Sequence, residues 1–335
     1  MDIWLCLLPL LALGLDALLG DPRGWPHPVC WIGWVLNRLE SKARAWAGAG
    51  GESGADVAEG VAKTVSAKRL RLAGVAAVLL VAGGAGGLVW LLSCLPGLGW
   101  LAALYFAYAG LALRGLVQEV DQARRTLLRE GIEPGRLAVS GLVSRDVGGA
   151  AEDDLYRALA ETLAENFNDA VMAPFFWLCL AGPAGLWAYK AVSTMDSMWG
   201  YKTERWRDLG WAAARLDDAL AWIPARISAA VLWFAAPRDA AGTWPGWAVI
   251  TSQARKMASP NAGWPMAAAA WLHDRTMGGP TRYHGSMVEK PLLGPEKAPV
   301  WDSASLQGLL RHIRRAGIVG SFALWSVATL IMLFV

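Results

Sequence analysis

The chain has 335 residues, of which 55% are hydrophobic and only 18% are charged, so it is more apolar than an ordinary soluble domain. Its net charge of +3, from 31 basic and 28 acidic residues, gives no reason to expect a nucleic-acid partner. The four cysteines are scattered and form no Cys-x-x-Cys pair, so neither a zinc site nor a disulfide framework is indicated. The 20 tryptophans fit a bilayer protein, because Trp favours the membrane–water interface.

Apolar stretches long enough to cross a lipid bilayer recur along the chain. The run 72–113 carries no charged residue and is long enough for two crossings. Residues 95–99, Leu-Pro-Gly-Leu-Gly, supply the turn between them, because Pro and Gly break helices. We therefore expect an all-α, polytopic integral membrane protein forming a single membrane-embedded domain, 1–335. It should have about five transmembrane or re-entrant segments, within 3–20, 72–113, 170–189, 219–236 and 316–335.

Polar segments connect these apolar runs. Residues 41–69 are rich in Gly, Ala and Ser and predict a flexible loop. Residues 114–226 form the central region, which we expect to be catalytic, with helical patterns at 115–130 and 152–169. Residues 237–315 predict a long hydrophilic loop that holds one short Trp- and Ala-rich helix near 264–274.

The Lys and Arg distribution predicts the orientation. Basic residues gather after the first apolar run and again after the third, whereas the link between the second and third runs has none. Cytoplasmic loops carry an excess of Lys and Arg, so we expect the N-terminus to lie outside and both basic segments to lie in the cytoplasm. The expected location of the chain is the cell membrane, that is, the inner or plasma membrane. Asp2 stands where a signal peptide is basic, so the first segment is expected to be retained.

Segment 170–189 is apolar but carries Pro174 and Pro183, which disfavour a straight helix. A full crossing would separate its two polar flanks by about 30 Å, on opposite faces of the bilayer. We therefore predict a broken or re-entrant segment that brings 161–169 and 190–218 to one cytoplasmic site. The competing interpretation is that the flanks lie on opposite sides of the membrane and only one is catalytic.

The densest polar constellation lies between Glu161 and Arg226. Glu161, Glu165 and Asp169 recur every four residues, which on a helix stacks three carboxylates on one face. Such a stripe suits Mg²⁺ and phosphate chemistry, and the plainer interpretation is a solvated acidic helix face. Many ionisable residues follow between apolar runs, where charges are costly and usually functional. Neither a Walker A motif nor a dinucleotide-binding glycine motif is present.

Two smaller polar groups lie elsewhere. Asp16 sits inside the first apolar run, where an acid is costly, although it is close enough to the end of the run to reach the interface. Asp21 and His27 follow it. The second group, 259–265, reads Ser-Pro-Asn-Ala-Gly-Trp-Pro, which is typical of a turn before a short helix, with a ligand-binding loop as the minority interpretation.

These residues resemble the adenosylcobinamide-phosphate synthase family of cobalamin biosynthesis over nearly the whole chain. The similar motifs, in the family's order, are 15–22, 26–29, 32–33, 164–169, 173–174, 196–202, 210–211, 214–218, 223–226, 259–265 and 278–280. The chain departs from the family at Ser193-Thr194, where Asn-Thr is usual, and at 144–147, Ser-Arg-Asp-Val, where Gly-Arg-Asp-Thr is usual. These departures bear on substrate preference more than on reaction class.

The resemblance implies an ATP- and Mg²⁺-dependent ligase that joins a carboxylate of adenosylcobyric acid to the amine of aminopropanol or of its O-phosphate. The corrinoid is then a substrate, the bilayer is a partner, and association with other cobalamin assembly enzymes is expected. The alternatives are a regulatory or sensor protein on the same scaffold and, from another class, a transporter with broken helices. The chain shows no inverted repeat, which disfavours the transporter.

The resemblance and the polar pattern together select the candidate site residues. The metal ligands are predicted to be Glu165, Asp169 and Asp217. The catalytic set is Glu165, Asn166, Asp169, Asp196, Lys202, Arg215, Asp217 and Asp218, in which Lys202 and Arg215 are expected to clamp anionic oxygens. The set expected to bind cofactor or substrate is Asp16, Asp21, His27, Lys190, Tyr201, Arg226 and Asn261.

Overall fold

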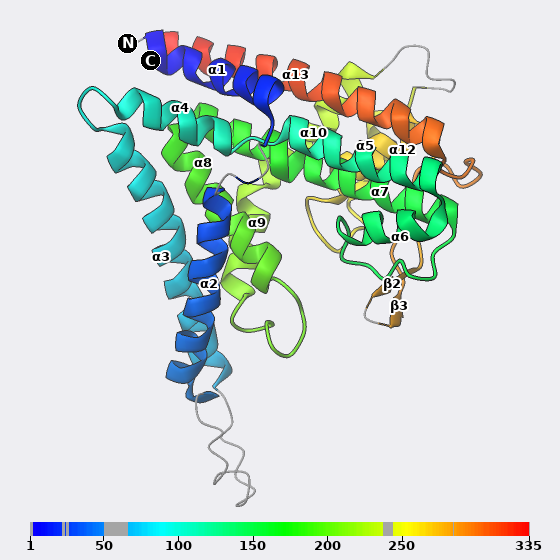
Figure 1. Ribbon diagram of the computed structural model, residues 1–335, viewed down its shortest axis with the longest axis horizontal. Coiled ribbons are helices and arrows are strands. Elements are labelled where there is room, and N and C mark those ends of the chain that lie inside the picture. The colour runs from blue at the N-terminus through cyan, green and yellow to red at the C-terminus, as the bar shows by residue number, and fades with distance from the viewer. Residues whose placement is uncertain are drawn as a thin grey trace, which may run out of the picture. The chain divides into compact units, whose positions relative to one another are not determined.

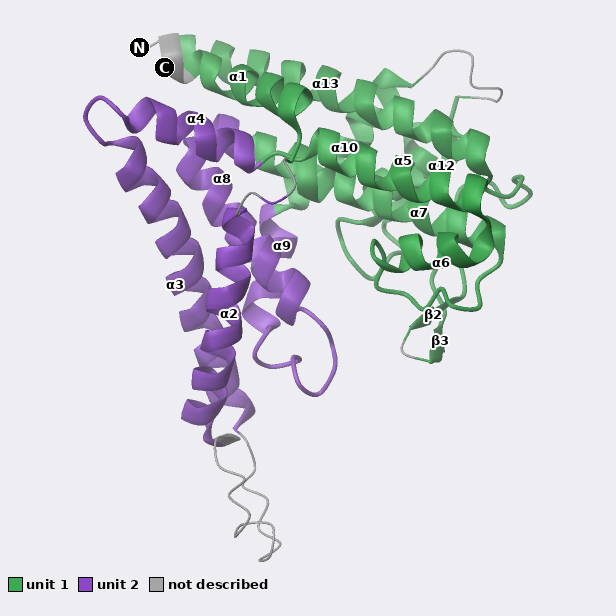
Figure 2. Cartoon of the chain, in the orientation of Figure 1, with its two compact units in different colours: residues 1–21, 111–176, 221–335 green, residues 22–110, 177–220 purple. Residues whose placement is uncertain are grey.

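The computed structural model describes residues 3–21, 24, 27–49, 66–236, 244–283 and 285–334. The described residues are mostly helical, which confirms the predicted all-α fold. They form two compact units (Figure 2). Unit 1 combines Met1–Asp21, Leu111–Phe176 and Ala221–Val335, and unit 2 combines Pro22–Gly110 and Trp177–Leu220. The central region 114–226 contributes to both units.

Unit 1 is a helical bundle in which α5, α7, α10, α12 and α13 pack together and α1 lies along α13 (Figure 1). Its core includes Leu155, Leu159 and Leu163 of α7, which recur every four residues and are fully buried. The helices of unit 1 are α1 (Ile3–Leu19), α5 (Leu113–Glu130), α6 (Ile132–Ser140), α7 (Glu152–Asn166), the π-helix η2 (Phe167–Met172), the start of α8 (Ala173–Trp199), α10 (Trp222–Ala235), α11 (Trp247–Ala254), α12 (Gly263–Leu272) and α13 (Ser303–Phe334).

The predicted hydrophilic loop 237–315 holds more structure than one short helix. Two antiparallel ribbons lie within it, one pairing β1 (Met277–Gly278) with β4 (Leu292–Leu293) and one pairing β2 (Thr281–Tyr283) with β3 (Ser286–Val288). Helix α13 begins at Ser303, well before the apolar run at 316. The first turns of α13 are amphipathic, with Leu306, Leu309 and Ile313 buried, so they continue the helix without continuing the apolar run.

Unit 2 pairs α2 with α3 and joins α3 to α4 in a helical hairpin (Figure 1). Residues 94–98 form its turn, as predicted. The predicted flexible loop 41–69 is too long at both ends, because helix extends to Ala49 and resumes at Ala67, and 50–65 lie outside the described residues. The helices are α2 (Pro28–Arg44), the π-helix η1 (Ala45–Ala49), α3 (Ala67–Ser93), α4 (Gly99–Ala109), most of α8, and α9 (Trp211–Leu220).

The apolar helices are those of a polytopic membrane protein. Among the described residues, 4 helical stretches are long and apolar enough to cross a membrane, or up to 5 when the bent pair α9–α10 counts as one span. Lipid-facing candidates are visible on α3, where Leu79 is 70% exposed, and at the end of α13, where Leu333 is 65% exposed. Helix α1 is apolar but has only 17 residues, which is short for a crossing.

Helix α8 is broken, which confirms that 170–189 does not form a straight helix. Ala181 has φ −135° and Gly182 has φ +64°, both outside helical geometry, directly before Pro183. A positive φ is readily adopted by glycine, and the following proline donates no backbone hydrogen bond. The kink thus has a local sequence cause. Its predicted consequence, a single site for both flanks, concerns groups in different units and stays a prediction.

A pair of histidines joins α12 to α13 and predicts a pH-dependent stability. His312 Nε2 donates to the Leu232 carbonyl at 2.9 Å, which leaves His312 Nδ1 to accept from His273 Nε2 at 3.0 Å. Burial, with the nearby charges of His312 and Arg275, lowers the pKa of His273 to about 3.

Because the pKa of His273 is lower in the folded chain than the ordinary value of about 6.5, protonation favours unfolding. The contribution of neutral His273 to the free energy of unfolding is therefore fully present above pH 6.5. It is lost progressively as the pH falls toward 3. At pH 5 we expect a loss of about 2 kcal/mol, measured as a lower thermal midpoint in detergent. The His273→Gln variant should show a flatter slope between pH 7.5 and 5, and an unchanged slope would contradict the assignment.

Candidate functional site

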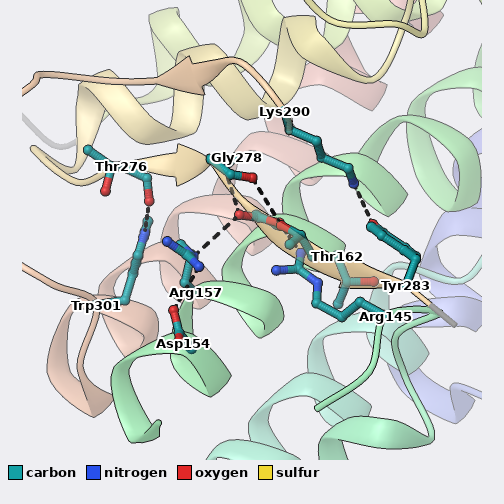
Figure 3. Close-up of polar contacts among 12 residues, drawn as sticks. Arg145, Asp154, Arg157, Thr162, Thr276, Gly278, Tyr283, Lys290 and Trp301 are labelled. Carbon is teal, nitrogen blue, oxygen red and sulfur yellow. Dashed lines mark hydrogen bonds and ion pairs between the residues drawn. The ribbon is translucent and has the colours of Figure 1, made fainter. Parts of the chain in front are cut away.

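A network of ion pairs and hydrogen bonds around a buried carboxylate lies within unit 1 (Figure 3). Glu161 of α7 is 3% exposed, and its carboxylate accepts a charge-assisted hydrogen bond from Arg145 and one from the Gly278 backbone N–H at 2.7 Å. Arg157, one turn earlier on α7, approaches it at 3.9 Å. A buried carboxylate is tolerated only when paired and hydrogen-bonded. Glu161 therefore ties α7, the segment after α6 and strand β1 together.

The glycine at 278 is required by the backbone at this point. Its φ is +81°, and a Cβ atom there would collide with the carbonyl oxygen of Pro291, which directly precedes the paired strand β4. Gly279 follows with φ +77°. A residue with a side chain is strained at positive φ, so the Gly-Gly pair places the 278 N–H on Glu161 where another residue would not fit. This accounts for the part of the 278–280 motif that the sequence alone left without a role.

An open cleft of about 500 Å³ adjoins the network, which we call the arginine cleft. Its basic lining residues are Arg145, Arg157 and Arg282. Asp154 pairs with Arg157 at 2.7 Å, and Asp146 accepts from the Gly285 N–H at 2.7 Å. Burial lowers the pKa of Arg145, although the guanidinium remains charged. Guanidinium forks bind phosphate and carboxylate oxygens bidentately, so the cleft suits an anionic ligand.

Glu165, one helical turn after Glu161, lies within the electrostatic range of both Arg145 and Lys290. The positive charges of Lys290 and Arg145 both act on its carboxylate, and its side chain is exposed. Lys290 donates to the Tyr283 hydroxyl and lies over its ring, 4.6 Å from the centroid. Of these residues only Glu165 was selected from the sequence. The others were missed because they come from segments far apart in the chain, and only the 144–147 and 278–280 motifs marked their neighbourhoods.

Asp169 does not continue the predicted carboxylate stripe. The α-helical repeat ends at Asn166 and the chain enters the π-helix η2, whose wider turn changes the register. Asp169 accepts a hydrogen bond from the Asn168 amide at 2.6 Å, and Asn168 in turn accepts from Ser228 of α10 at 3.1 Å. Single π-helical turns often occur at functional sites, so the departure keeps Asp169 as a candidate for a different geometric reason.

Asp21 and Asn166, selected from two distant motifs, line one cavity of about 290 Å³. Glu119 of α5 and Thr162 of α7 line it with them, and we call this the acidic cavity. Asp16 lies nearby and is 1% exposed, and its Oδ2 accepts from the Arg114 backbone N–H at 3.2 Å. The structure therefore brings together residues of the first and central motifs that are more than a hundred positions apart.

Arg226 and Asn261 also meet within unit 1. The Arg226 guanidinium donates to the Asn261 side-chain oxygen at 3.1 Å and to the Trp222 carbonyl at 2.7 Å. It also lies over the rings of Trp222 and Trp264, at 4.1 and 4.6 Å from their centroids. Such cation–π contacts hold a guanidinium in place. The contact links α10 to the 259–265 motif, and a ligand-binding role for the two residues stays a prediction.

In unit 2, four of the predicted catalytic residues lie near the end of α8, in the loop after it and on α9. They are Asp196, Lys202, Arg215 and Asp218, and we call them the unit 2 cluster. The carboxylate of Asp196 is influenced by the charge of Asp218, and Asp218 by the charges of Arg215 and Lys202. Gly200 makes this packing feasible, because a Cβ there would collide with the Asp196 side chain. These acidic and basic side chains interact electrostatically and are partly exposed. Such a group suits the binding of a charged part of a substrate.

The remaining candidates of unit 2 have other surroundings. His27 caps the start of α2, accepting from the Val29 N–H at 3.2 Å, while its Nε2 bonds the Ala109 carbonyl at 2.9 Å. Lys190 is half-buried on α8, and Tyr201 is exposed in the loop after it. The binding roles of these three residues stay predictions. Pro22 and Pro26 of the opening motif lie outside the described residues.

The residues that the structure describes contain no group of three or more His, Cys, Asp or Glu side chains arranged to hold a metal ion. Glu165 and Asp169 belong to unit 1 and Asp217 to unit 2. Mg²⁺ commonly takes one or two carboxylates and completes its shell with water and substrate phosphates. The chemistry of Glu165, beside basic residues, fits that arrangement, and a metal site shared with Asp217 stays a prediction.

Comparison with known proteins places this arrangement in a family. The model of the CobD/Cbib protein family matches residues 9–313. The chain is 37% identical to the cobalamin biosynthesis protein CobD of Stutzerimonas stutzeri (strain A1501) over 290 residues, covering 86% of this chain and 87% of that protein. It is 32% identical to the cobalamin biosynthesis protein CbiB of Salmonella arizonae over 325 residues, covering 96% and 93%.

A further relative, the cobalamin biosynthesis protein CobD of Pelobacter propionicus, is 34% identical over 334 residues, covering 96% of this chain and 94% of that protein. No solved structure matches the chain significantly. The family match and the relatives extend over the segments that build the ion-pair network, the arginine cleft and the unit 2 cluster. The chain belongs to the CobD/CbiB family.

Proposed function

We propose that the chain is a membrane-bound, ATP-dependent ligase of cobalamin biosynthesis. It joins a carboxylate of adenosylcobyric acid to the amine of aminopropanol or its O-phosphate and forms an amide. The names of the relatives support the pathway, and the single observation that carries the reaction class is the arginine cleft. Arg145 is held there by buried Glu161, with Glu165 and Lys290 beside it.

Amide formation from a carboxylate requires that one carboxylate oxygen become a leaving group. ATP supplies this activation by transferring its γ-phosphoryl group to the oxygen, and ADP leaves. The amine nitrogen then bonds the carbonyl carbon and loses a proton, while the C–O bond breaks and inorganic phosphate leaves. The chain's task is to bind and orient anionic groups and to offset charge that develops in the transition state. Arg145, Arg157 and Arg282, which line the cleft, would bind phosphate or carboxylate oxygens.

Magnesium fits the acidic side of the same region. Glu165 would hold the ion together with phosphate oxygens, with Asp169 in the π-helical turn as a second ligand or as a ligand to its water shell. Bound Mg²⁺ would neutralise phosphate charge during transfer. Lys290, held by Tyr283, would supply a further positive charge toward Glu165 and the phosphates.

In this proposal the unit 2 cluster binds a charged part of the substrates. Lys202 and Arg215 would attract anionic oxygens, and the carboxylate of Asp218 lies within the electrostatic range of both bases. Asp196 is influenced by the charge of Asp218. The corrinoid is large and partly apolar, so an enzyme at the membrane edge, rich in Trp, can cover its ring. The expected partners are therefore the two substrates, the bilayer and other enzymes of cobalamin assembly.

The proposed site faces the cytoplasm, where ATP is available, in the cell membrane. Single cysteines at positions 50 and 130, in a background lacking Cys6, Cys30, Cys94 and Cys179, should react with a membrane-impermeant maleimide only after the cells are opened. The reason is the excess of Lys and Arg on both segments. Labelling of either position in intact cells would contradict the predicted orientation.

The proposal is tested with the purified full chain in detergent or nanodiscs. Adenosylcobyric acid, aminopropanol or its O-phosphate, ATP and Mg²⁺ are supplied, and the corrinoid amide is measured by mass spectrometry. We expect amide formation that requires ATP and all the other components. A sensor or a transporter built on the same scaffold would yield no amide under any of these conditions, and that result would reject the ligase.

A further inference from the structure

We infer that unit 1 binds the phosphate group of a membrane phospholipid beside α10, at a place we call the double-arginine site. The site consists of Arg226 of α10, Arg255 at the end of α11 and the 259–265 turn that leads into α12. Arg255 was not among the residues selected from the sequence. The inference goes beyond the proposed ligase reaction and does not depend on it.

The packing of α10 and α11 on α12 brings the two arginines together. Both helices contact α12. Gly263, the first residue of α12, permits a close approach to α11, because a Cβ atom there would lie 2.4 Å from the Ala254 carbonyl oxygen. Arg255 directly follows Ala254 as the C-cap residue of α11, so the same contact fixes where its backbone lies. As a result, the positive charge of Arg255 acts on Arg226.

Two like charges within range of each other favour an anionic ligand when no carboxylate neutralises them. Among the described residues, no Asp or Glu forms an ion pair with Arg226, Arg255 or the neighbouring Lys256. The sequence 222–265 adds one further base, Arg238, and one acid, Asp239, which both lie outside the described residues. Bases therefore outnumber acids in this segment, and an anion that contacts both arginines offsets their repulsion.

The Arg226 guanidinium is held so that one of its edges is available to a ligand. Its Nη1 group donates to the Trp222 carbonyl at 2.7 Å and to Asn261 Oδ1 at 3.1 Å, and the guanidinium lies over the rings of Trp222 and Trp264. Its Nε and Nη2 groups make no hydrogen bond to the part of the chain that the structure describes. These two groups form the fork that binds two phosphate oxygens at once.

The surroundings of this edge favour a phospholipid over a soluble phosphate. Ile223 and Phe234 of α10 are 50% and 74% exposed, so the helix offers apolar surface on both sides of Arg226 in sequence. Arg226, Ala230 and Phe234 recur every four residues and share one side of α10, and Phe234 lies about 12 Å further along the helix axis. An acyl chain can cover this surface while its phosphate meets the arginines. Trp222, which is 52% exposed, is typical of the membrane–water interface.

The test is native mass spectrometry of the delipidated full chain with added phosphatidylglycerol. Diacylglycerol with the same acyl chains, which lacks the phosphate, serves as the matched ligand. We expect the wild type to retain phosphatidylglycerol and not diacylglycerol. Arg255→Gln should weaken phosphatidylglycerol binding at least about fivefold, because one of the two charges is lost. Arg226→Lys, which keeps the charge but not the fork, should also weaken it. Arg129→Gln removes the same charge from the exposed end of α5 and should leave binding unchanged.

Arg255 is exposed, so Arg255→Gln should unfold at the same temperature as the wild type, and a binding defect then reports on the site. Equal retention of the two lipids, or equal losses of binding in Arg255→Gln and Arg129→Gln, would overturn the inference. Calorimetry with glycerol 3-phosphate tests the soluble source of the same chemistry. If glycerol 3-phosphate binds through Arg255 and no phospholipid is retained, the phosphate is not that of a lipid, and the inference fails.

Discussion

The Glu161→Gln variant is expected to unfold more easily than the wild type by about 3–5 kcal/mol, the usual cost of removing one partner of a buried ion pair. Glu161 is 3% exposed, and the side chain of Arg145 is 10% exposed, so neither charge is well solvated by water. Loss of the carboxylate charge leaves Arg145 without its hydrogen-bonded counter-ion and weakens the bond from the Gly278 N–H. The arginine cleft should lose its shape along with the stability.

The measurement is chemical or thermal unfolding of the purified protein in detergent, with an exposed pair as the control. Glu133 pairs with Arg136 at 2.5 Å, but its side chain is 76% exposed. Exposed pairs contribute between zero and about 1 kcal/mol, so Glu133→Gln should change stability by less than that. Similar effects of the two substitutions would show that the Glu161 network does not hold unit 1 together.

The second large effect is expected in turnover. Asp169→Asn should lower kcat by about a hundredfold or more while the protein remains folded, because one charge next to the proposed phosphate and Mg²⁺ site disappears at nearly constant shape. The matched control is Asp274→Asn. Asp274 is exposed and has φ +50°, a conformation that Asn adopts readily, so activity there should be unchanged.

Thermal unfolding of Asp169→Asn separates a chemical defect from a structural one. The Asn168 amide that donates to Asp169 can still donate to the new side-chain oxygen, so the midpoint should fall only slightly. A folded variant with near-normal turnover would remove Asp169 from the site. Elevated Mg²⁺ that partly restores the rate would further support a role as a metal ligand.

The sequence predicted those parts of the fold that have a local cause. The turn at 94–98, the amphipathic helix α5 and the break before Pro183 follow from Pro, Gly and apolar periodicity. The early start of α13 and the two short ribbons were missed. The start of α13 contains Ser303, Ser305 and Gln307 and then Arg311, Arg314 and Arg315, so by composition it resembles a polar loop. Strands of two or three residues carry no periodic signal.

Among the residues selected from the sequence, some lie together because they are close in the chain, and two pairs, Asp21 with Asn166 and Arg226 with Asn261, come from distant motifs. Asp196 and Asp218 meet across one loop, and Glu165 lies one helical turn after Glu161. Arg145, Lys290 and Glu119 were not selected, because the contacts that define them depend on tertiary packing. Glu161 and Gly278 are 117 positions apart, a separation at which helical spacing carries no information.

The central claim, ATP-dependent activation of a corrinoid carboxylate, is tested most directly with adenosylcobyric acid labelled with ¹⁸O in that carboxylate. Purified chain would be supplied with the amine, ATP and Mg²⁺, and both products analysed by mass spectrometry. The account predicts one corrinoid amide for each ATP consumed, with one ¹⁸O transferred to inorganic phosphate. Absence of the amide, or an amide formed without transfer of ¹⁸O to phosphate, would contradict it.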